Sequence, residues 1–368
     1  MKLTYLLLFA PFALLGRLLS WSPEVVFAFS FLGLVPLASK LGEATEQLTV
    51  HVGPRAGGLL NATFGNTPEL VLFFALLRSG QLDIVKASIT GSIMTSLLLV
   101  VGTSQVVAGL KGGVQRFNKE TAGMAAGMMT LAVIGLIVPT LFSLVQQVGL
   151  NQNISTEFSD PALDNLSFAV AIVLALLYVL YLVFQFMQGP AATDIPAEVE
   201  AGEVTSAWSI RRAVLVLVAA TLGIAVLSEI LSDVVEPVGD SLGLSPLFMG
   251  VILLPLVSNV SEMLVGTRLA RRGQLDLAFT TSTSSATQVA LFVAPVLVLI
   301  SPLFGPELTL SFGIFEVVGL ALVIFTVTLL LGDGLSNWLE GAQLLALYII
   351  LALWFLFYDD PVVLTAGL

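Results

Sequence analysis

Two stretches of this chain, 193 positions apart, repeat one another, and each carries a single glutamate inside an otherwise apolar segment. Eight positions of the first stretch hold the same residue type as the position 193 further on, and these are Asn66, Glu69, Arg78, Gly80, Gln81, Leu82, Asp83 and Ser92. Their counterparts are Asn259, Glu262, Arg271, Gly273, Gln274, Leu275, Asp276 and Ser285. Self-similarity at a fixed offset predicts two copies of one structural unit. Two copies with an acidic residue in each membrane segment are typical of secondary transporters.

The composition places the chain in a lipid bilayer. Hydrophobic residues make up 57% of it, charged residues make up 11%, and its mean hydropathy is +1.00. A soluble protein of 368 residues could not bury this much apolar surface, so the sequence predicts an all-α integral membrane protein. Because the chain has no cysteine and only one histidine, His51, we expect no thiolate or histidine-cluster metal site. It also lacks phosphate-binding loops, nucleophile elbows and basic clusters, so we expect no enzyme activity, no cofactor and no nucleic-acid partner.

Apolar runs that are bounded by charged or Pro/Gly-rich turns predict the membrane-crossing helices. We expect about 11 transmembrane helices, at 3–20, 24–40, 57–77, 83–109, 121–147, 165–187, 211–232, 243–267, 276–300, 309–331 and 338–357. The first of them has an alternative interpretation as a cleaved signal peptide, because Lys2 precedes a short apolar run, although no clear small-residue cleavage site follows. Ten core helices remain in either case.

The distribution of lysine and arginine predicts the orientation of these helices. Of the 14 basic residues, 11 lie in loops on the side of the amino terminus and three on the other side. The amino terminus is therefore predicted to be cytoplasmic, and the carboxyl terminus outside. The two motifs lie on the third and eighth helices, and an odd shift of five helices inverts the second copy in the membrane. The predicted fold is a ten-helix core of two inverted five-helix repeats plus one N-terminal helix.

The repeat also predicts how the chain is divided. Residues 1–22 form the extra N-terminal helix, residues 23–187 the first inverted repeat, and residues 211–368 the second. Residues 188–210 are polar and contain four acidic residues and no basic ones, which predicts an acidic cytoplasmic linker. A solvated charged segment and a cation-sensing segment are both open at this point.

Each copy of the motif offers an amide oxygen and a carboxylate at one depth of the membrane. On a helix, Asn66 and Glu69 are three residues apart and share a face, and so do Asn259 and Glu262. With water and free backbone carbonyls, these groups supply the roughly six to eight oxygens that Ca²⁺ prefers. The motif contains no sulfur and no imidazole, so it favours a hard cation over zinc or copper.

Proline residues beside the motif free backbone oxygens. Pro68 cannot donate to the helix ladder and crowds the carbonyl of Phe64, so this carbonyl is available to a ligand. Pro255 stands in a similar position ahead of Asn259. We therefore include the Phe64 carbonyl among the possible cation ligands.

Acidic residues inside membrane helices are costly, at about 2.5–3.5 kcal/mol each, and usually mark an ion or proton path. Glu69 and Glu262 are duplicated together with their asparagines, so we predict that they bind the transported ion. Glu229 and Glu316 lie in or near apolar spans without a repeat partner. For these two, an ion path and a buried hydrogen bond between helices are both open.

The helix after each motif carries many hydroxyl groups. Ser92 and Ser285 are a matched pair, and Gln288 has Thr95 as its counterpart. Close packing of helices explains most small polar residues in membrane segments. For these four residues, lining of the ion site and close packing are both open.

These residues carry a resemblance to a known family. The segment Gly-Asn-Thr-Pro-Glu-Leu at 65–70, followed by Lys86-Ala87-Ser88 and Gly91-Ser92, resembles the first signature of the Ca²⁺/H⁺ exchanger (CAX) family of the cation/Ca²⁺ exchanger superfamily. The run Ser-Ala-Thr-Gln-Val-Ala-Leu-Phe-Val-Ala-Pro at 285–295 is similar to the helix after its second signature. The resemblance extends to the segments around both motifs and so covers nearly the whole chain.

The resemblance implies a transporter that moves Ca²⁺ out of the cytosol in exchange for H⁺, in the plasma membrane of a prokaryote. It implies that Glu69 and Glu262 carry Ca²⁺ and protons in turn. The same resemblance places five polar side chains around the site, and these are Asn66, Asn259, Ser92, Ser285 and Gln288.

Three positions depart from the family pattern. The second signature of the family usually begins with glycine and ends with histidine, where this chain has Ser258 and Met263. Ser96 stands where an asparagine is common. Because Met263 cannot titrate or accept a strong hydrogen bond, any role of that histidine in proton handling is absent here.

The expected mechanism is competition of Ca²⁺ and protons for one site that opens to each side in turn. Two bare carboxylates in a low dielectric repel each other, so either the cation or protons must neutralise them before the site changes sides. A Na⁺-coupled or differently selective exchanger of the same fold is the alternative, and a Na⁺ gradient against a pH gradient would discriminate the two. A cation sensor or a channel is a further alternative, since a channel would show flux without counter-ion coupling.

Overall fold

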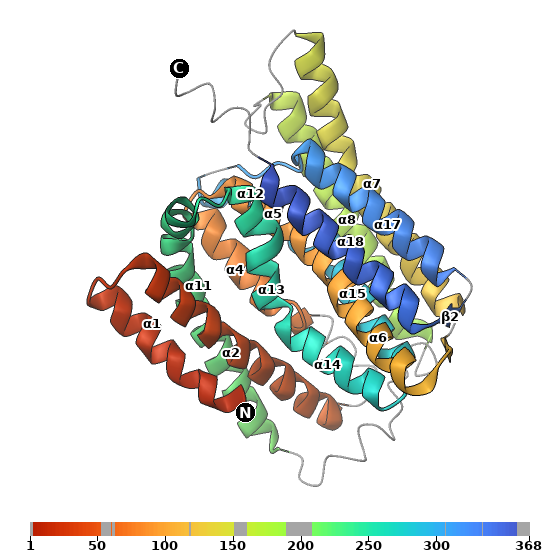
Figure 1. The fold of residues 1–368 in the computed structure, drawn as a ribbon. Helices are drawn as coiled ribbons and strands as arrows, with labels where there is room; N and C mark the ends of the chain where they lie inside the picture. Colours follow the sequence, from red (N-terminus) through yellow and green to blue (C-terminus); the bar gives the residue numbers. More distant parts are fainter. Residues whose placement is uncertain are drawn as a thin grey trace.

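The computed structural model describes residues 3–52, 60, 63–117, 119–150, 160–188, 208–305, 307–332 and 334–358. These residues form a bundle of helices (Figure 1). Two short strands, β1 (Gln115–Arg116) and β2 (Leu335–Ser336), pair antiparallel between helices of the two halves. The prediction of an all-α protein is confirmed. The predicted linker at 188–210 lies outside the described residues except for its two ends.

The helical segments of the first half are η1 (Leu3–Leu8), α1 (Phe9–Leu18), α2 (Pro23–Val52), α4 (Thr67–Arg78), α5 (Leu82–Met94), η2 (Thr95–Val100), α6 (Val101–Gly112), α7 (Lys119–Gly149) and α8 (Pro161–Gln188). Those of the second half are α11 (Ile210–Leu242), α12 (Pro246–Phe248), η3 (Met249–Leu253), α13 (Leu254–Ser258), α14 (Val260–Arg271), α15 (Leu275–Gln288), η4 (Val289–Val293), α16 (Ala294–Ile300), η5 (Ser301–Leu303), α17 (Ile314–Leu331) and α18 (Trp338–Phe357). Segments η2, η3 and η4 are π-helical turns inside longer helices.

Eight of the described helices are long and apolar enough to cross a membrane, namely Pro23–Val52, Leu82–Gly112, Gly123–Gly149, Pro161–Met187, Ile210–Leu242, Leu275–Leu303, Ile314–Leu331 and Trp338–Phe357. A ninth forms if Pro246–Ser258 and Val260–Arg271, which meet at a bend of 53°, make one span. The shorter helices α1 and α4 occupy the two remaining predicted ranges, of which 57–77 lies partly outside the described residues. A total of 11 crossings therefore stays a prediction.

The two halves repeat one another in backbone conformation as well as in sequence. Adding 193 to the bounds of α4, Thr67–Arg78, gives those of α14, Val260–Arg271. The turns that follow both contain a glycine with positive φ, +79° at Gly80 and +76° at Gly273. These left-handed turns need glycine because a side chain is strained there. The π-helical turns η2 and η4 begin within one residue of matching positions, at Thr95 and Val289.

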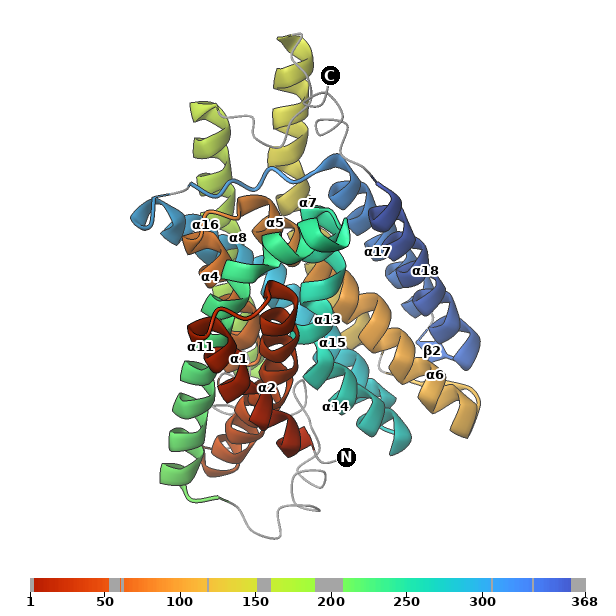
Figure 2. The ribbon, with the colours of Figure 1, turned by 60° about the vertical axis from the view of Figure 1, so that its left-hand side comes forward.

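The two glycine turns lie at opposite ends of the bundle. The continuous helix Leu82–Gly112 starts just after Gly80, and at its far end the Lys111 ammonium donates to the backbone oxygen of Arg271, 3.4 Å away. A helix of this length spans roughly 45 Å. The α4–α5 and α14–α15 turns also lie at opposite ends in Figures 1 and 2. This placement is the inversion that the sequence predicts.

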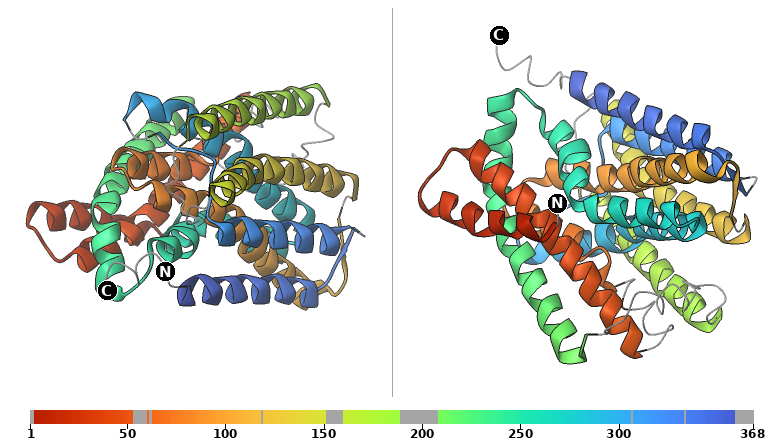
Figure 3. Two further views of the ribbon diagram at one scale, coloured as in Figure 1. Left: turned by 90° about the horizontal axis from the view of Figure 1, so that it is seen from above. Right: turned by 60° about the horizontal axis from the view of Figure 1, so that its bottom comes forward.

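The helices α1, α2 and α11 gather on one side of the molecule (left in Figure 1), and α7, α8 and α17 on the other (Figure 3). The motif helices α4, α5, α14 and α15 lie between these groups. Their interior is apolar, with Phe73, Leu76 and Leu97 completely buried. Large apolar side chains such as Leu180 and Phe325 are exposed on the outer helices, which fits contact with lipid.

Two glycines bring α5 and η3 into backbone contact. A Cβ atom added at Gly91 would lie 2.2 Å from the backbone oxygen of Val251, and one added at Gly250 would lie 2.4 Å from the Cβ of Ala87. Small residues allow such close approach between membrane helices. This contact fixes the helix that follows the first motif against the helix that leads into the second.

Polar contacts join α11 to the Gly80 end of the bundle. The side-chain amide of Gln81 donates to the backbone oxygen of Ser232 at 2.8 Å, and Arg78 lies 3.7 Å from the Glu229 carboxylate. The repeat places Gln274 at the other end, and there it makes no matching contact with α2 among the residues that the structure describes. The counterpart of Glu229 in α2 is Pro36, which cannot form an ion pair.

Candidate functional site

Both copies of the motif interrupt their helices at the asparagine. Asn66 has φ −102° and ψ 23°, and Asn259 has φ −89° and ψ 2°, and a new helix begins directly after each. Pro68 follows in the first turn of α4, where a missing backbone N–H is not needed. The prediction of one continuous helix through asparagine and glutamate is corrected here, because each asparagine is the N-terminal cap of the helix that carries the glutamate.

Asn66 does not use its side chain to cap its own helix but reaches across to α15 of the other repeat. Its amide nitrogen donates to the Gln288 side-chain oxygen at 2.9 Å and to the Ser285 backbone oxygen at 3.2 Å. The Ser285 hydroxyl donates in turn to the Asn66 side-chain oxygen at 2.8 Å. These bonds bring together three of the residues that the sequence predicts for the site.

Asn259 makes the corresponding contacts with the first repeat. Its amide nitrogen donates to the Ser92 hydroxyl at 3.1 Å and to the Pro255 backbone oxygen at 3.0 Å. The Ser96 hydroxyl donates to the Asn259 side-chain oxygen at 2.8 Å. Each half of the site is therefore built from an asparagine of one repeat and hydroxyl groups of the other.

The two glutamates lie in the first turns of α4 and α14, close enough to each other to interact electrostatically. The Glu262 carboxylate accepts from the hydroxyls of Ser285 at 2.6 Å and Ser96 at 3.3 Å, one to each oxygen. Glu69 is 2% exposed, and its Oε2 atom is buried without a hydrogen-bond partner. The Ser258 hydroxyl lies beside this carboxylate.

A buried carboxylate oxygen that has no hydrogen-bond partner and lies beside a second carboxylate costs free energy unless a cation or a proton binds it. The surrounding groups are neutral oxygens and amides, and no cluster of three acidic or histidine residues accompanies the pair among the described residues. Hard cations with oxygen ligands suit such a donor set. Two carboxylates with neutral neighbours can hold a divalent ion and also release it.

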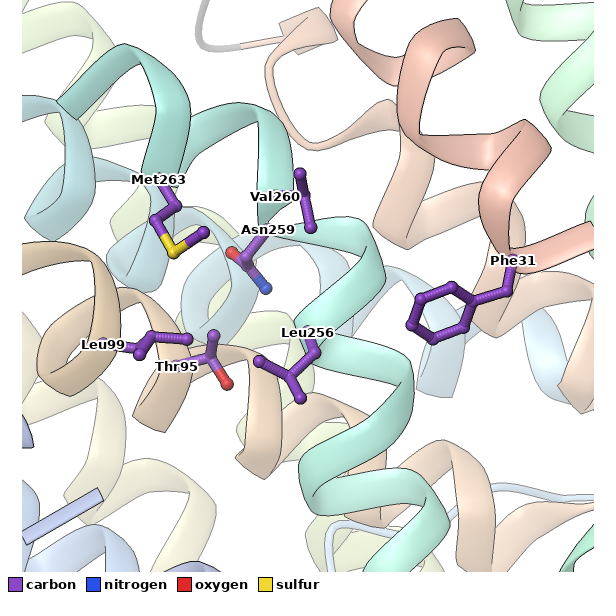
Figure 4. Close-up of a pocket in the computed structure, with 7 residues that line it drawn as sticks. All are labelled: Phe31, Thr95, Leu99, Leu256, Asn259, Val260 and Met263. Carbon is purple, nitrogen blue, oxygen red and sulfur yellow. The ribbon is translucent and has the colours of Figure 1, made fainter. Parts of the chain in front are cut away.

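A cavity of about 200 Å³ borders this site (Figure 4). Its lining comes from α2, η2, α13 and α14 with the bend between the last two, and consists of Phe31, Thr95, Leu99, Leu256, Asn259, Val260 and Met263. Asn259 is the member of this lining that also belongs to the hydrogen-bonded site. Met263 lines the cavity at the position where the family usually has histidine. Its thioether cannot titrate, so no titratable side chain faces the cavity from this position.

Three residues that the sequence offers as further candidates lie outside the hydrogen-bonded site. Thr95 is buried on the cavity wall, with its hydroxyl 3.4 Å from that of Tyr348. The Phe64 ring packs beside the apolar cluster of α2 and α11, and its backbone precedes the break at Asn66. Glu229 is half exposed and pairs with Arg78.

Glu316 is a buried carboxylate outside this pair. It caps the N-terminus of α17, where it accepts from the Gly313 backbone N–H at 2.7 Å and from the Thr90 hydroxyl at 3.0 Å. Lys86, itself 5% exposed, is close enough to interact with it electrostatically. Of the two roles open from the sequence, these contacts favour a hydrogen bond between helices.

Substitution of Glu316 is expected to lower stability without changing cation affinity. Glu316→Gln keeps an acceptor for Thr90 but removes the charge that faces Lys86, and Glu316→Ala removes both. We expect a loss of about 1–3 kcal/mol for the alanine variant, the usual effect of leaving buried donors unsatisfied. Thermal unfolding in detergent and the apparent KM of the folded variants check this, and a raised KM with normal stability would contradict it.

Two residues that the sequence marks only as departures from the family pattern, Ser96 and Ser258, lie at the centre of the site. Ser96 and Ser258 contact the second motif, but neither has a like residue in the other repeat, where Val289 and Gly65 stand at the matching positions. A search for matched pairs therefore misses them. The available signal was the helical spacing of Ser92 and Ser96, which places both on one face of the helix.

Comparison with known proteins agrees with this architecture. The family model described as sodium/calcium exchanger protein matches residues 23–187 and 212–357. A Ca²⁺/H⁺ antiporter of Aphanothece halophytica is 40% identical over 98% of this chain and 97% of its own length. The Ca²⁺/H⁺ antiporter ChaA of Bacillus subtilis is 38% identical over 94% of this chain and 95% of its own length.

A solved structure gives the same result for the fold. The structure of native YfkE superimposes with a TM-score of 0.81 and is 35% identical, covering 97% of this chain and 100% of the other. The repeat, the paired motifs and these matches extend over both halves of the sequence. The chain therefore belongs to the sodium/calcium exchanger protein family, and within it to the Ca²⁺/H⁺ exchangers that the sequence resembles.

Proposed function

We propose that this protein is a secondary active antiporter that exports cytosolic Ca²⁺ in exchange for H⁺. The observation that carries the proposal is the pair of neighbouring glutamates, one from each inverted repeat, of which Glu69 is buried and keeps an oxygen without a partner. Such an oxygen is available to a cation or a proton. The named relatives, which are Ca²⁺/H⁺ antiporters at 38–40% identity, support the same ion pair.

Charge balance is the proposed basis of the exchange. With both carboxylates ionised, Ca²⁺ neutralises the pair; after the ion leaves, protons neutralise it instead. Two unneutralised charges in the membrane interior cost several kcal/mol, so the empty site is not expected to change sides. Obligatory exchange follows, because only the two neutral forms of the site cross between the two orientations.

The interlocked hydrogen bonds suggest how the two sides alternate. Asn66 binds Ser285 of the second repeat, and Asn259 binds Ser92 of the first. Movement of one repeat relative to the other therefore changes both halves of the site at once. Inverted repeats provide two such arrangements, one open to each side of the membrane.

The location follows from the same assignment. The protein is an integral membrane protein with apolar outer helices. We propose that it lies in a prokaryotic plasma membrane with the amino terminus in the cytoplasm and the carboxyl terminus outside. The excess of lysine and arginine in loops on the amino-terminal side supports this orientation.

A Na⁺-coupled exchanger is the second candidate, favoured by Met263, which offers no titratable group where it lines the cavity beside Asn259. Proteoliposomes that contain the purified protein distinguish the two. We expect radioactive Ca²⁺ uptake when a pH gradient is imposed and none when a Na⁺ gradient replaces it. Uptake with Na⁺ alone would establish the second candidate, and uptake without any gradient coupling would indicate a channel.

A further inference from the structure

The two carboxylates of the site are not held alike, although the chain is built from two copies. Both oxygens of Glu262 lie within hydrogen-bonding distance of a serine hydroxyl, that of Ser285 at 2.6 Å and that of Ser96 at 3.3 Å. The Oε2 atom of Glu69, by contrast, has no hydrogen-bond partner. The repeat alone does not predict this difference, since Glu69 and Glu262 match.

One source of the difference is a pair of positions at which the two copies do not match. Ser96 is the second residue of the π-helical turn η2. Its counterpart is Val289, the first residue of η4. Valine cannot donate a hydrogen bond. Ser96 is completely buried and lies within hydrogen-bonding distance of both Asn259 and Glu262, so it joins the two ligands of the second motif. Val289 offers no such hydroxyl to the first motif.

A serine hydroxyl carries one proton, so Ser96 donates to one of its two oxygens at a time. At 2.8 Å the Asn259 oxygen is the closer acceptor, and the Glu262 oxygen lies at 3.3 Å. A cation that binds either oxygen leaves the hydroxyl free to donate to the other. The hydroxyl therefore keeps both ligands oriented with or without the ion.

We propose that Ser96 is a positioning residue that pre-forms the Glu262 half of the cation site, whereas Val289 leaves the Glu69 half to be completed by the ion itself. The inference rests on the proposed function and deepens it. Groups that orient a metal ligand without touching the metal commonly affect affinity by about 10- to 100-fold. A ligand that is already held in place loses less entropy when the ion binds. We therefore expect Ser96 to affect the affinity of the site for the ion.

Ser96→Ala tests the proposal directly. We expect the apparent KM for Ca²⁺ in pH-driven uptake to rise by about tenfold, at the lower end of that range, with little change in maximal rate. Equilibrium binding of radioactive Ca²⁺ to the detergent-solubilised protein should weaken by a similar factor. Ser104→Ala is the matched control, because it removes a buried hydroxyl of the same continuous helix that has no hydrogen-bond partner.

Val289→Ser tests the role of the second position. Because position 289 corresponds to position 96 in the repeat, we expect a hydroxyl there to donate to Glu69 and to lower the KM of the Ser96→Ala protein toward the wild-type value. If Ser96 had only a structural role, Val289→Ser in the opposite repeat would not restore the KM. Thermal unfolding of each variant verifies that the compared proteins are folded.

The outcomes separate this inference from the proposed function. If the wild type exchanges Ca²⁺ for H⁺ and Ser96→Ala has the wild-type KM, Ser96 does not position the ligand and the inference alone fails. A raised KM that Val289→Ser does not lower in the folded double variant overturns the division between the two halves. A wild type that neither binds nor transports Ca²⁺ overturns the proposed function together with the inference.

Discussion

Glu69→Gln and Glu262→Gln are each expected to reduce Ca²⁺ uptake by at least about 30-fold. Glutamine preserves the shape of the side chain but removes one of the two charges that balance the ion. Truncating one member of a buried charged pair costs about 2–5 kcal/mol, and each 1.4 kcal/mol is a factor of ten. A single carboxylate also leaves the site with one unbalanced positive charge when Ca²⁺ binds, which opposes the change of sides.

The matched control is Glu24→Gln. Glu24 lies in the first turn of α2, as Glu69 does in α4, but it is exposed. Uptake by this variant should equal that of the wild type in proteoliposomes with the same amount of protein. Substantial pH-driven uptake by a folded Glu69→Gln or Glu262→Gln protein would show that the pair does not carry the ion.

Gly91→Ala is expected to have the largest effect on folding, with a loss of at least about 3 kcal/mol or failure to accumulate folded protein. The added methyl group would meet the oxygen, Cα and carbonyl carbon of Val251 at 2.2–2.6 Å. These are backbone atoms, so no side-chain rotation relieves the overlap. Separation of α5 from η3 would also displace Ser92 from Asn259.

Gly42→Ala provides the comparison for this variant. Gly42 lies inside α2, and no atom lies within 4 Å of a Cβ added there. Alanine favours helix over glycine by up to about 1 kcal/mol, so stability should be unchanged or slightly higher. Thermal unfolding monitored by size-exclusion chromatography measures both variants, and similar midpoints for the two would contradict the close contact of α5 and η3.

Much of the fold could be predicted because membrane helices and internal repeats leave direct marks in the sequence. The offset of 193 positions correctly predicts that α4 and α14 correspond and that their glycine turns lie at opposite ends. The break at Asn66 and Asn259 was not predicted, because asparagine followed by a helix-compatible segment fits both a helix interior and an N-cap. The π-helical turns were not predicted either, since they arise from packing between segments that are distant in the chain.

The site was predicted only where the two copies agree. Asn66, Ser285 and Gln288 form one hydrogen-bonded group, as expected from the motif and the helix that follows it. Ser96 was missed as a contact of Glu262 because its counterpart is Val289, and comparison of copies discards positions that differ. Glu316 could not be assigned from the sequence, because its partners Gly313 and Thr90 meet only in the folded bundle.

The contacts between α11 and the Gly80 end have a consequence for the resting state of the transporter. Two equal copies would give two arrangements of equal free energy, each obtained from the other by exchanging the copies. At the offset of 193 positions, Arg271 and Pro36 correspond to Arg78 and Glu229, and proline carries no charge, so the exchanged arrangement has no equivalent ion pair. An exposed pair contributes up to about 1 kcal/mol, which is roughly a fivefold difference in population. The unloaded protein should therefore spend most of its time facing one side, at a ratio that Arg78 and Glu229 adjust without touching the ion.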